Sequence, residues 1–195
     1  MTILPIEVVV RFQELLRRAR ETDLREPAAM TLATAGADGR VSARIVLLRE
    51  FDERGFVFYT NLNSHKAIQI NANAPVALCF HWDAIAEQVR IEGTAALIAN
   101  EDADAYWKDR PRESQIGAWA SRQSETLDSP ETLERRVAEI ELEFRGQAVP
   151  RPEFWSGYRV SPRRIEFWAN RPARLHERIV YEWNERGWSQ RMLYP

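Results

Sequence analysis

The chain has 195 residues, one cysteine and a formal net charge of −2, so its length accommodates one domain and its charge balance disfavours bulk nucleic-acid binding. No apolar run approaches the roughly 20 residues of a membrane helix, and the N-terminus lacks the basic region and apolar core of a secretory signal. Because Cys79 has no second cysteine to pair with, we expect a cytoplasmic protein whose single domain spans residues 1–195.

The first part of the chain changes from a helical to a strand pattern. Residues 6–20 carry apolar side chains at helical spacing, which predicts an amphipathic helix within the N-terminal segment 1–24. Strands are expected at residues 30–34, 41–48 and 56–60. The next helix covers about residues 64–73, with Ser64 as its N-cap residue.

The second part mixes strands with helices and ends in strands. Strands are expected at residues 76–82 and 88–98. A helix should follow Asn100 and run through Trp107, and a second short helix should lie near residues 116–120. Ser129 followed by Pro130 is typical of a helix start, and this helix should run to about Phe144. The remainder alternates like three or four antiparallel strands. Together these elements predict a mainly β fold, an antiparallel barrel with peripheral helices inserted between residues 25 and 195.

The segment Arg174-Leu175-His176-Glu177-Arg178 is the most informative stretch of the sequence. If it is extended, Arg174, His176 and Arg178 lie on one face, because side chains alternate with a period of two. Two cations flanking an imidazole suit a planar, anionic ligand, because Arg offers a rigid fork of donors for phosphate and can stack on a ring. A solvated strand face is an equally acceptable interpretation.

Two further constellations point to phosphate. Lys66 lies in the first turn of a helix, where the unpaired N–H groups attract anions and a cation is otherwise disfavoured. An ordinary capped helix explains Ser64 but not Lys66. Tyr106 and Arg110 are four residues apart on one helix face, and together with Ser114 they form a credible phosphate clamp. A surface Arg packed on a Tyr ring is at least as common.

The remaining candidates are less specific. Arg44 and Arg49 are separated by an odd interval, so a strand would place them on opposite faces, and we favour solvent-exposed strand ends for both. The three histidines are dispersed and none has metal-ligand spacing, so no metal site is predicted. No Ser-His-Asp, Cys-His or paired-carboxylate arrangement can be assigned from spacing. The absence of Gly-x-Gly-x-x-Gly argues against a Rossmann site, and any chemistry should belong to a cofactor that the protein positions.

Several of these segments recur together in a known family. The chain closely resembles the pyridoxamine/pyridoxine 5′-phosphate oxidase family through an ordered series of motifs from about residue 25 to Pro195. The motifs are Arg44-Ile45-Val46-Leu47-Leu48, Phe58-Tyr59-Thr60-Asn61-Leu62, residues 110–119, Arg122-Gln123-Ser124, residues 154–160, Ile165-Glu166-Phe167-Trp168 and residues 174–178. Each motif is weak alone, whereas the ordered set is highly specific.

The resemblance implies an FMN-binding split β-barrel of the antiparallel Greek-key type, working as a homodimer with two FMN sites at the subunit interface. It also implies oxidation of pyridoxamine or pyridoxine 5′-phosphate to pyridoxal 5′-phosphate, with oxygen as electron acceptor and hydrogen peroxide as the reduced product. The rival interpretations are a split-barrel flavin oxidase for another aromatic substrate, such as a phenazine precursor, and a non-catalytic flavin or pyridoxal phosphate carrier. The phosphate clamp favours the first interpretation, since a non-phosphorylated substrate would not need it.

Carried over by motif, the resemblance assigns residues to three tasks. The residues expected to bind FMN are Arg44, Ile45, Val46, Leu47, Leu48, Arg49, Tyr59, Thr60, His65, Lys66, Gln88, Gln123, Ser124, Trp168 and Arg178. Those expected to bind substrate are Arg49, Tyr106, Arg110, Ser114, Arg174 and His176. Arg174 and His176 are also the expected catalytic residues, facing the flavin against the pyridine ring and its hydroxyl.

Three departures from the family pattern accompany the resemblance. Arg49 stands where the family usually has Lys, which keeps the charge but changes the donor geometry near both flavin and substrate phosphate. His65 stands where an Arg is common beside Lys66, so phosphate binding should be weaker or pH-sensitive. The chain is also expected to lack the leading segment that covers the substrate in longer members, which would affect closure more than chemistry.

Overall fold

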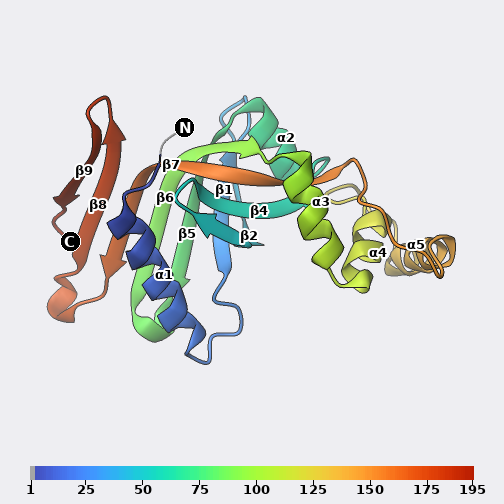
Figure 1. The fold of residues 1–195 in the computed structure, drawn as a ribbon, viewed down its shortest axis with the longest axis horizontal. Helices are drawn as coiled ribbons and strands as arrows, with labels where there is room; N and C mark the ends of the chain where they lie inside the picture. The colour runs from blue at the N-terminus through green and yellow to red at the C-terminus, as the bar shows by residue number, and fades with distance from the viewer. Residues whose placement is uncertain (1–2) are drawn as a thin grey trace.

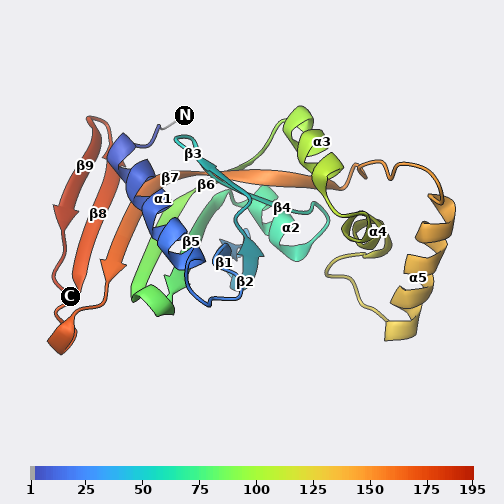
Figure 2. The ribbon, with the colours of Figure 1, turned by 60° about the horizontal axis from the view of Figure 1, so that its bottom comes forward.

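The computed structural model describes residues 3–195, which form a curled antiparallel sheet with helices at its edges (Figures 1 and 2). The strands are β1 (Ala29–Ala35), β2 (Val41–Leu47), β3 (Glu50–Asp52), β4 (Gly55–Asn61), β5 (Pro75–Trp82), β6 (Glu87–Leu97), β7 (Trp155–Ala169), β8 (Glu177–Asn184) and β9 (Gly187–Met192). The helices are α1 (Ile6–Arg20), α2 (His65–Ala72), α3 (Asn100–Asp109), α4 (Arg112–Ala120) and α5 (Pro130–Glu143), with short 3₁₀ turns η1 (Asp83–Ile85) and η2 (Pro172–Arg174).

The strands follow the order β2-β1-β5-β6-β7-β4-β3, and the β8–β9 hairpin adds to β7. Every pair of neighbouring strands among the described residues is antiparallel. β7 is the longest strand and reaches from the helices α3–α5 at one end of the molecule to the β8–β9 hairpin at the other (Figures 1 and 2). The predicted mainly β, antiparallel fold with peripheral helices is confirmed.

The main core fills the concave side of the sheet beneath α1. Phe12 on α1 is 1% exposed, and its ring contacts Phe51, Phe56, Phe80 and Trp82 at centroid distances of 4.5–5.9 Å. Such aromatic pairs add stability beyond the area they bury. The amphipathic pattern of the N-terminal helix is therefore explained by its role as the cover of this core.

A smaller apolar cluster ties α3, α4 and α5 to the start of β7. It centres on Trp107, Ile116, Val149 and Trp155, and Val137, Ile140 and Phe144 of the neighbouring segment pack against it. Trp107 donates its ring N–H to the carbonyl of Val149. This cluster gives the helical end of the molecule its own packing, separate from the core beneath α1.

Most predicted elements are observed, with small differences at their ends. The short strand β3 was not predicted, and α4 begins at Arg112 rather than near residue 116. Ser129 caps α5 as expected, because its hydroxyl accepts from the N–H of Thr132 at 3.3 Å. Ser64 occupies the N-cap position of α2, but its side chain makes no capping hydrogen bond.

The condition that residues 174–178 are extended is not met in the first half of this segment. Ala173 and Arg174 both have left-handed backbone angles, with φ of 58° and 61°, and β8 begins only at Glu177. Alternation with a period of two therefore does not relate Arg174 to His176 and Arg178. Among the helices of residues 3–195, none is long and apolar enough to cross a membrane.

Candidate functional site

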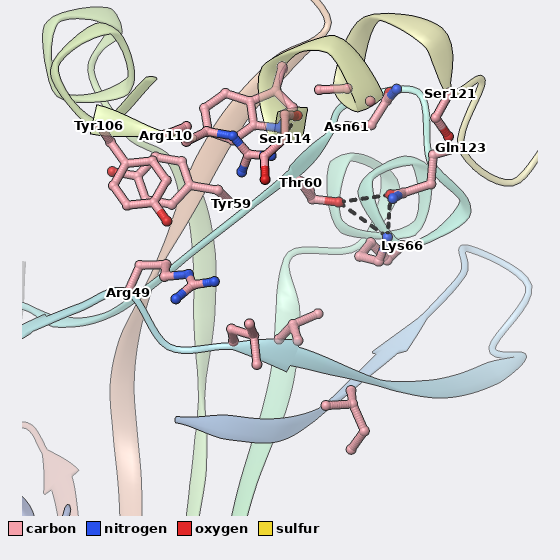
Figure 3. Close-up of a pocket in the computed structure, with 16 residues that line it drawn as sticks. Arg49, Tyr59, Thr60, Asn61, Lys66, Tyr106, Arg110, Ser114, Ser121 and Gln123 are labelled. Atoms are coloured by element: carbon pink, nitrogen blue, oxygen red, sulfur yellow. Dashed lines mark hydrogen bonds between the residues drawn. The ribbon is translucent and has the colours of Figure 1, made fainter. Parts of the chain in front are cut away.

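A cavity of about 400 Å³ opens between β2, β4 and the helices α2, α3 and α4 (Figure 3). It is lined by Ile45, Val46, Leu47, Arg49, Tyr59, Thr60, Asn61, Lys66, Tyr106, Arg110, Ser114, Gly117, Ala118, Ser121, Gln123 and Trp155. The lining includes three cations and no carboxylate. Its charge and size suit an anionic small molecule, since ligand sites are concave, largely apolar and furnished with a few well-placed polar groups.

Lys66 forms the centre of one side of the cavity. Its ammonium donates to the Gln123 side-chain oxygen at 2.8 Å and to the Thr60 hydroxyl at 3.2 Å (Figure 3). It also donates to the Ser64 hydroxyl at 3.2 Å. These partners are all neutral. Burial, assisted by the charge of Arg44, lowers the pKa of Lys66 to about 8. A half-buried cation with only neutral partners favours an anion as its additional ligand.

The backbone at the start of α2 strengthens this anion site. The N–H of His65 donates to the hydroxyl of Ser124 at 3.2 Å, so a residue from a distant loop caps the helix in place of Ser64. Ser124 has a left-handed φ of 76°, which is uncommon for a residue other than Gly. The structure therefore brings Lys66, Gln123 and Ser124, three of the residues expected to bind FMN, close together, although the helix cap comes from a different serine than expected.

Arg44 lies beside this group without lining the cavity. Its guanidinium donates to the carbonyl of Leu32 at 3.2 Å, to the hydroxyl of Thr34 at 2.6 Å and to the hydroxyl of Ser42. Gln69 on α2 accepts from both hydroxyls. Arg44 is thus another cation with neutral partners, and it is held firmly rather than placed at a solvent-exposed strand end.

The opposite side of the cavity is formed by three stacked aromatic rings, on which the Arg110 side chain packs. The rings of Tyr59 and Tyr106 stack at 3.9 Å with 8° between their planes, and Trp155 stacks on Tyr59 at 5.2 Å. The Arg110 guanidinium lies 4.7 Å from the centroid of the Trp155 ring. Gly157 faces Tyr59 across β4 and β7, and a Cβ there would approach the Tyr59 ring to 3.0 Å.

Arg110 has an unused donor. Its Nη2 donates to the backbone carbonyl of Ser114 at 3.1 Å, whereas its Nε is buried and has no partner within residues 3–195. Burial lowers the pKa of the guanidinium, and the nearby charge of Arg49 lowers it further. A buried donor without a partner is costly unless a ligand satisfies it. The predicted cluster of Tyr106, Arg110 and Ser114 is therefore assembled at the cavity wall.

Of the other residues expected to bind the cofactor in this region, some line the cavity and one lies in the core. Ile45, Val46, Leu47 and Arg49 line the cavity, as expected for cofactor contacts, whereas Leu48 is 6% exposed and belongs to the main core. Tyr59 donates its hydroxyl to Glu50 at 2.7 Å. Burial first, and then this carboxylate, raises the pKa of the Tyr59 hydroxyl.

A second group of predicted residues lies at the other end of the molecule. Gln88, Trp168 and Arg178 form one row across β6, β7 and β8, and the His176 ring lies 4.6 Å from the Trp168 ring. Trp155 in the cavity and Trp168 in this row are thirteen residues apart on β7, about 40 Å along an extended strand. Figures 1 and 2 show α3–α5 and the turn before β8 at opposite ends of the molecule.

Arg174 and His176 occupy the turn that precedes β8. A hollow of about 600 Å³ there is lined by Arg171, Leu175, His176, Glu177 and residues 192–195. The Nδ1 of His176 accepts weakly from the backbone N–H of Arg171 at 3.4 Å. The Arg174 side chain is exposed and makes no hydrogen bond or ion pair within residues 3–195. One chain therefore does not bring Arg174 and His176 to the cavity.

Sequence reasoning missed several residues of the cavity, namely Asn61, Gly117, Ala118, Ser121 and Trp155. Most of these contribute small side chains or backbone and leave no chemical signal. Trp155 is different, because its ring supports both Tyr59 and Arg110. Its position within the resembling motif 154–160 was the one available indication. Among residues 3–195, no group of three or more His, Cys, Asp and Glu side chains is arranged to hold a metal ion.

Two family descriptions match the chain in consecutive segments. Residues 16–144 match "Pyridoxamine 5'-phosphate oxidase", and residues 155–195 match "Pyridoxine 5'-phosphate oxidase C-terminal dimerisation region". The second segment contains the row of Trp168 and Arg178 and the turn with Arg174 and His176.

Relatives and solved structures agree with these matches. The chain is 51% identical over 193 residues to a pyridoxine/pyridoxamine 5′-phosphate oxidase of Myxococcus xanthus, covering 99% of this chain and 94% of that protein. It is 56% identical over 184 residues to the corresponding protein of Rubrobacter xylanophilus, with 94% and 83% coverage. PhzG from Burkholderia lata, solved with tetrahydrophenazine-1-carboxylic acid, has a TM-score of 0.90 and 33% identity, covering 98% of this chain and 93% of that one. On this basis, the chain belongs to the pyridoxamine 5′-phosphate oxidase family.

Proposed function

We propose that the protein is an FMN-dependent oxidase that converts pyridoxamine and pyridoxine 5′-phosphate to pyridoxal 5′-phosphate, as needed for vitamin B6 biosynthesis or salvage. Oxygen accepts the electrons and leaves as hydrogen peroxide. The observation that carries the proposal is the pair of cationic groups on opposite sides of one cavity, Lys66 and Arg110, neither of which has an acidic partner (Figure 3). Two separate phosphate positions flanking aromatic rings suit a phosphorylated cofactor and a phosphorylated substrate.

The residues present fit FMN. Lys66 can give up a hydrogen bond to one of its neutral partners and contact a dianionic phosphate instead. The N–H groups at the start of α2 can donate to the same phosphate. Ile45, Val46 and Leu47 offer an apolar strand edge beside the same cavity. Bound FMN supplies a ring that accepts a hydride equivalent and then reduces oxygen.

The protein's own groups bind and orient the substrate. Tyr106, Arg110 and Ser114 hold its phosphate, and the Trp155 ring, itself stacked on Tyr59, keeps Arg110 in place. Fixing both reactants can supply about 7–11 kcal/mol of the barrier. Arg49 adds a permanent positive charge to the same wall, close enough to affect Arg110. The Arg found here in place of Lys keeps that charge and offers a broader fork of donors.

We place FMN at the interface of a homodimer. In one chain, the cavity lies about 40 Å along β7 from the second group of expected site residues, which are Gln88, Trp168, Arg174, His176 and Arg178. Only a second subunit can therefore bring these side chains to the cavity. The match of residues 155–195 to a dimerisation region supports this arrangement. His176 then hydrogen-bonds the ring hydroxyl of the substrate and Arg174 stabilises negative charge. A reducing compartment, the cytoplasm, agrees with Cys79 as a free thiol.

The purified protein tests this function directly. It should be yellow, bleach without air when pyridoxine 5′-phosphate is added, and release peroxide when air returns. A colourless protein that binds no added FMN would contradict the flavoenzyme. A yellow protein that bleaches with tetrahydrophenazine-1-carboxylic acid, the compound bound to PhzG, and not with B6 phosphates would favour the rival oxidase of another aromatic substrate.

The pKa of Lys66 gives the FMN site a defined pH dependence. Lys66 is cationic below a pKa of about 8 and neutral above it, so raising the pH through 8 removes the charge that attracts the phosphate. We expect the Kd of FMN to rise about tenfold between pH 7.5 and 9.5. Flavin fluorescence titration measures it. The dependence should disappear in Lys66→Met and for riboflavin, which lacks the phosphate; an equal dependence for riboflavin would contradict this role.

A further inference from the structure

The residues at the β8 end that are expected to bind the cofactor lie next to a row of charged residues on the same sheet. Gln88, Trp168 and Arg178 are directly opposite one another across β6, β7 and β8. Two residues further along the strands, the next row contains Arg90 and Glu166. Because side chains two residues apart share a face of a sheet, both rows project from the same surface. Glu166 is therefore the diagonal neighbour of Arg178.

Glu166 is an almost fully buried carboxylate surrounded by three arginines. Its side chain is 1% exposed. One oxygen accepts from the Nε of Arg178 at 2.7 Å, and the other accepts from Arg164 at 3.3 Å and Arg90 at 3.4 Å. Burial alone would raise the pKa of this carboxyl, but the hydrogen bond from Arg178 and the three positive charges lower it overall. The carboxylate is thus charged, and its shortest bond is to Arg178.

Arg178 depends on Glu166 more than the other two arginines do. Arg164 and Arg90 also lie near a second carboxylate, Glu92, at 2.6 and 3.8 Å. Within residues 3–195, Arg178 has Glu166 as its sole acidic partner. Its Nη1 donates to the carbonyl of Tyr194 at 3.2 Å, and its Nη2 has no partner in that part of the chain. Two nitrogens are therefore fixed, and one is left for a ligand.

We propose that Glu166 is a positioning residue that holds Arg178 in the orientation in which its remaining nitrogen donates to FMN. This inference rests on the proposed function, because it takes FMN as the ligand of Arg178. A rigid guanidinium held at one edge loses less rotamer freedom when it binds, so the support acts on affinity for the cofactor. A purely structural ion pair would instead act on folding alone.

A double-mutant cycle on FMN affinity tests the proposal. The full chain is stripped of flavin, and the Kd of FMN is measured by fluorescence for Glu166→Gln, alone and combined with Arg178→Met or Lys66→Met. We expect Glu166→Gln to raise the Kd about tenfold, as for loss of a hydrogen bond to a charged group. The same tenfold effect should persist with Lys66→Met, which acts at the phosphate. It should vanish with Arg178→Met, because Glu166 then has nothing to orient.

Glu92→Gln is the matched control, since Glu92 contacts Arg164 and not Arg178, and it should leave the Kd unchanged. An unchanged Kd in Glu166→Gln, or an effect that persists in the Arg178→Met background, would overturn the proposal. If Glu166→Gln does not fold, as shown by its circular dichroism, Glu166→Asp enters the same cycle. Failure of the wild-type protein to bind FMN would refute the proposed function instead.

Discussion

Replacing Arg174 with Met is expected to lower kcat about 100-fold, the usual effect of removing one stabilising donor, while the Kd of FMN changes less than twofold. The Arg174 side chain is exposed and makes no hydrogen bond or ion pair within residues 3–195, so its removal breaks no internal contact. Its left-handed backbone conformation is unfavourable for Arg. A turn that retains this strain fits a side chain selected for what it presents to a ligand.

Steady-state peroxide release and fluorescence titration with FMN measure the two quantities separately. Arg171→Met is the matched control from the same turn, because the Arg171 side chain pairs with Glu177 and only its backbone N–H contacts His176. That variant should keep kcat within about twofold of wild type, since surface ion pairs contribute little. Equal losses of turnover and FMN affinity in Arg174→Met would identify Arg174 as a flavin ligand.

Replacing Arg110 with Ala is expected to raise the KM for pyridoxine 5′-phosphate at least about 30-fold, which corresponds to losing about 2 kcal/mol from a buried charged contact. The Arg110 guanidinium is half-buried on the Trp155 ring, and its Nε lacks a partner. A phosphate is the natural acceptor for that donor. Because the change lies away from the flavin phosphate, FMN affinity should remain close to that of wild type.

Arg112→Ala provides the comparison for Arg110. Arg112 lies two residues away, but its guanidinium donates to the carbonyls of Phe144 at 2.6 Å and Gln147 at 2.8 Å, outside the cavity. Its removal should lower the melting temperature and leave KM unchanged. An unchanged KM in Arg110→Ala would refute the phosphate clamp, and a rise in both variants would indicate a general disturbance of α4.

Sequence periodicity predicted the fold well where a single face is buried. The N-terminal helix and strand β1 show this, because α1 buries Val8, Phe12, Leu15 and Ala19 at helical spacing and β1 buries every second residue. The three-residue strand β3 was missed, since its pattern is too short to detect. The turn at Ala173 and Arg174 was missed because neither residue is one that usually marks a left-handed conformation, as Gly or Asn would.

The candidate site was predicted only in part. Lys66 was found from its unusual place in a first helical turn, and the structure adds the neutral partners that explain it. The stack of Arg110 on Trp155 joins residues 45 apart in sequence, and no local pattern reports such a contact. The support that Glu166 gives Arg178 was likewise hidden, because a Glu in a strand is normally interpreted as a solvent-facing residue.

With FMN at the proposed homodimer interface, the distance between Trp155 and Trp168 along β7 also means that each site is built from two copies of the same chain. A subunit carrying Arg110→Ala still has an intact β8 end, and a subunit carrying Arg174→Met still has an intact cavity. Each mutant homodimer would be impaired, but a mixed dimer would contain one complete site. Random reassociation makes half of the dimers mixed, so two impaired preparations refolded together should recover about a quarter of wild-type activity.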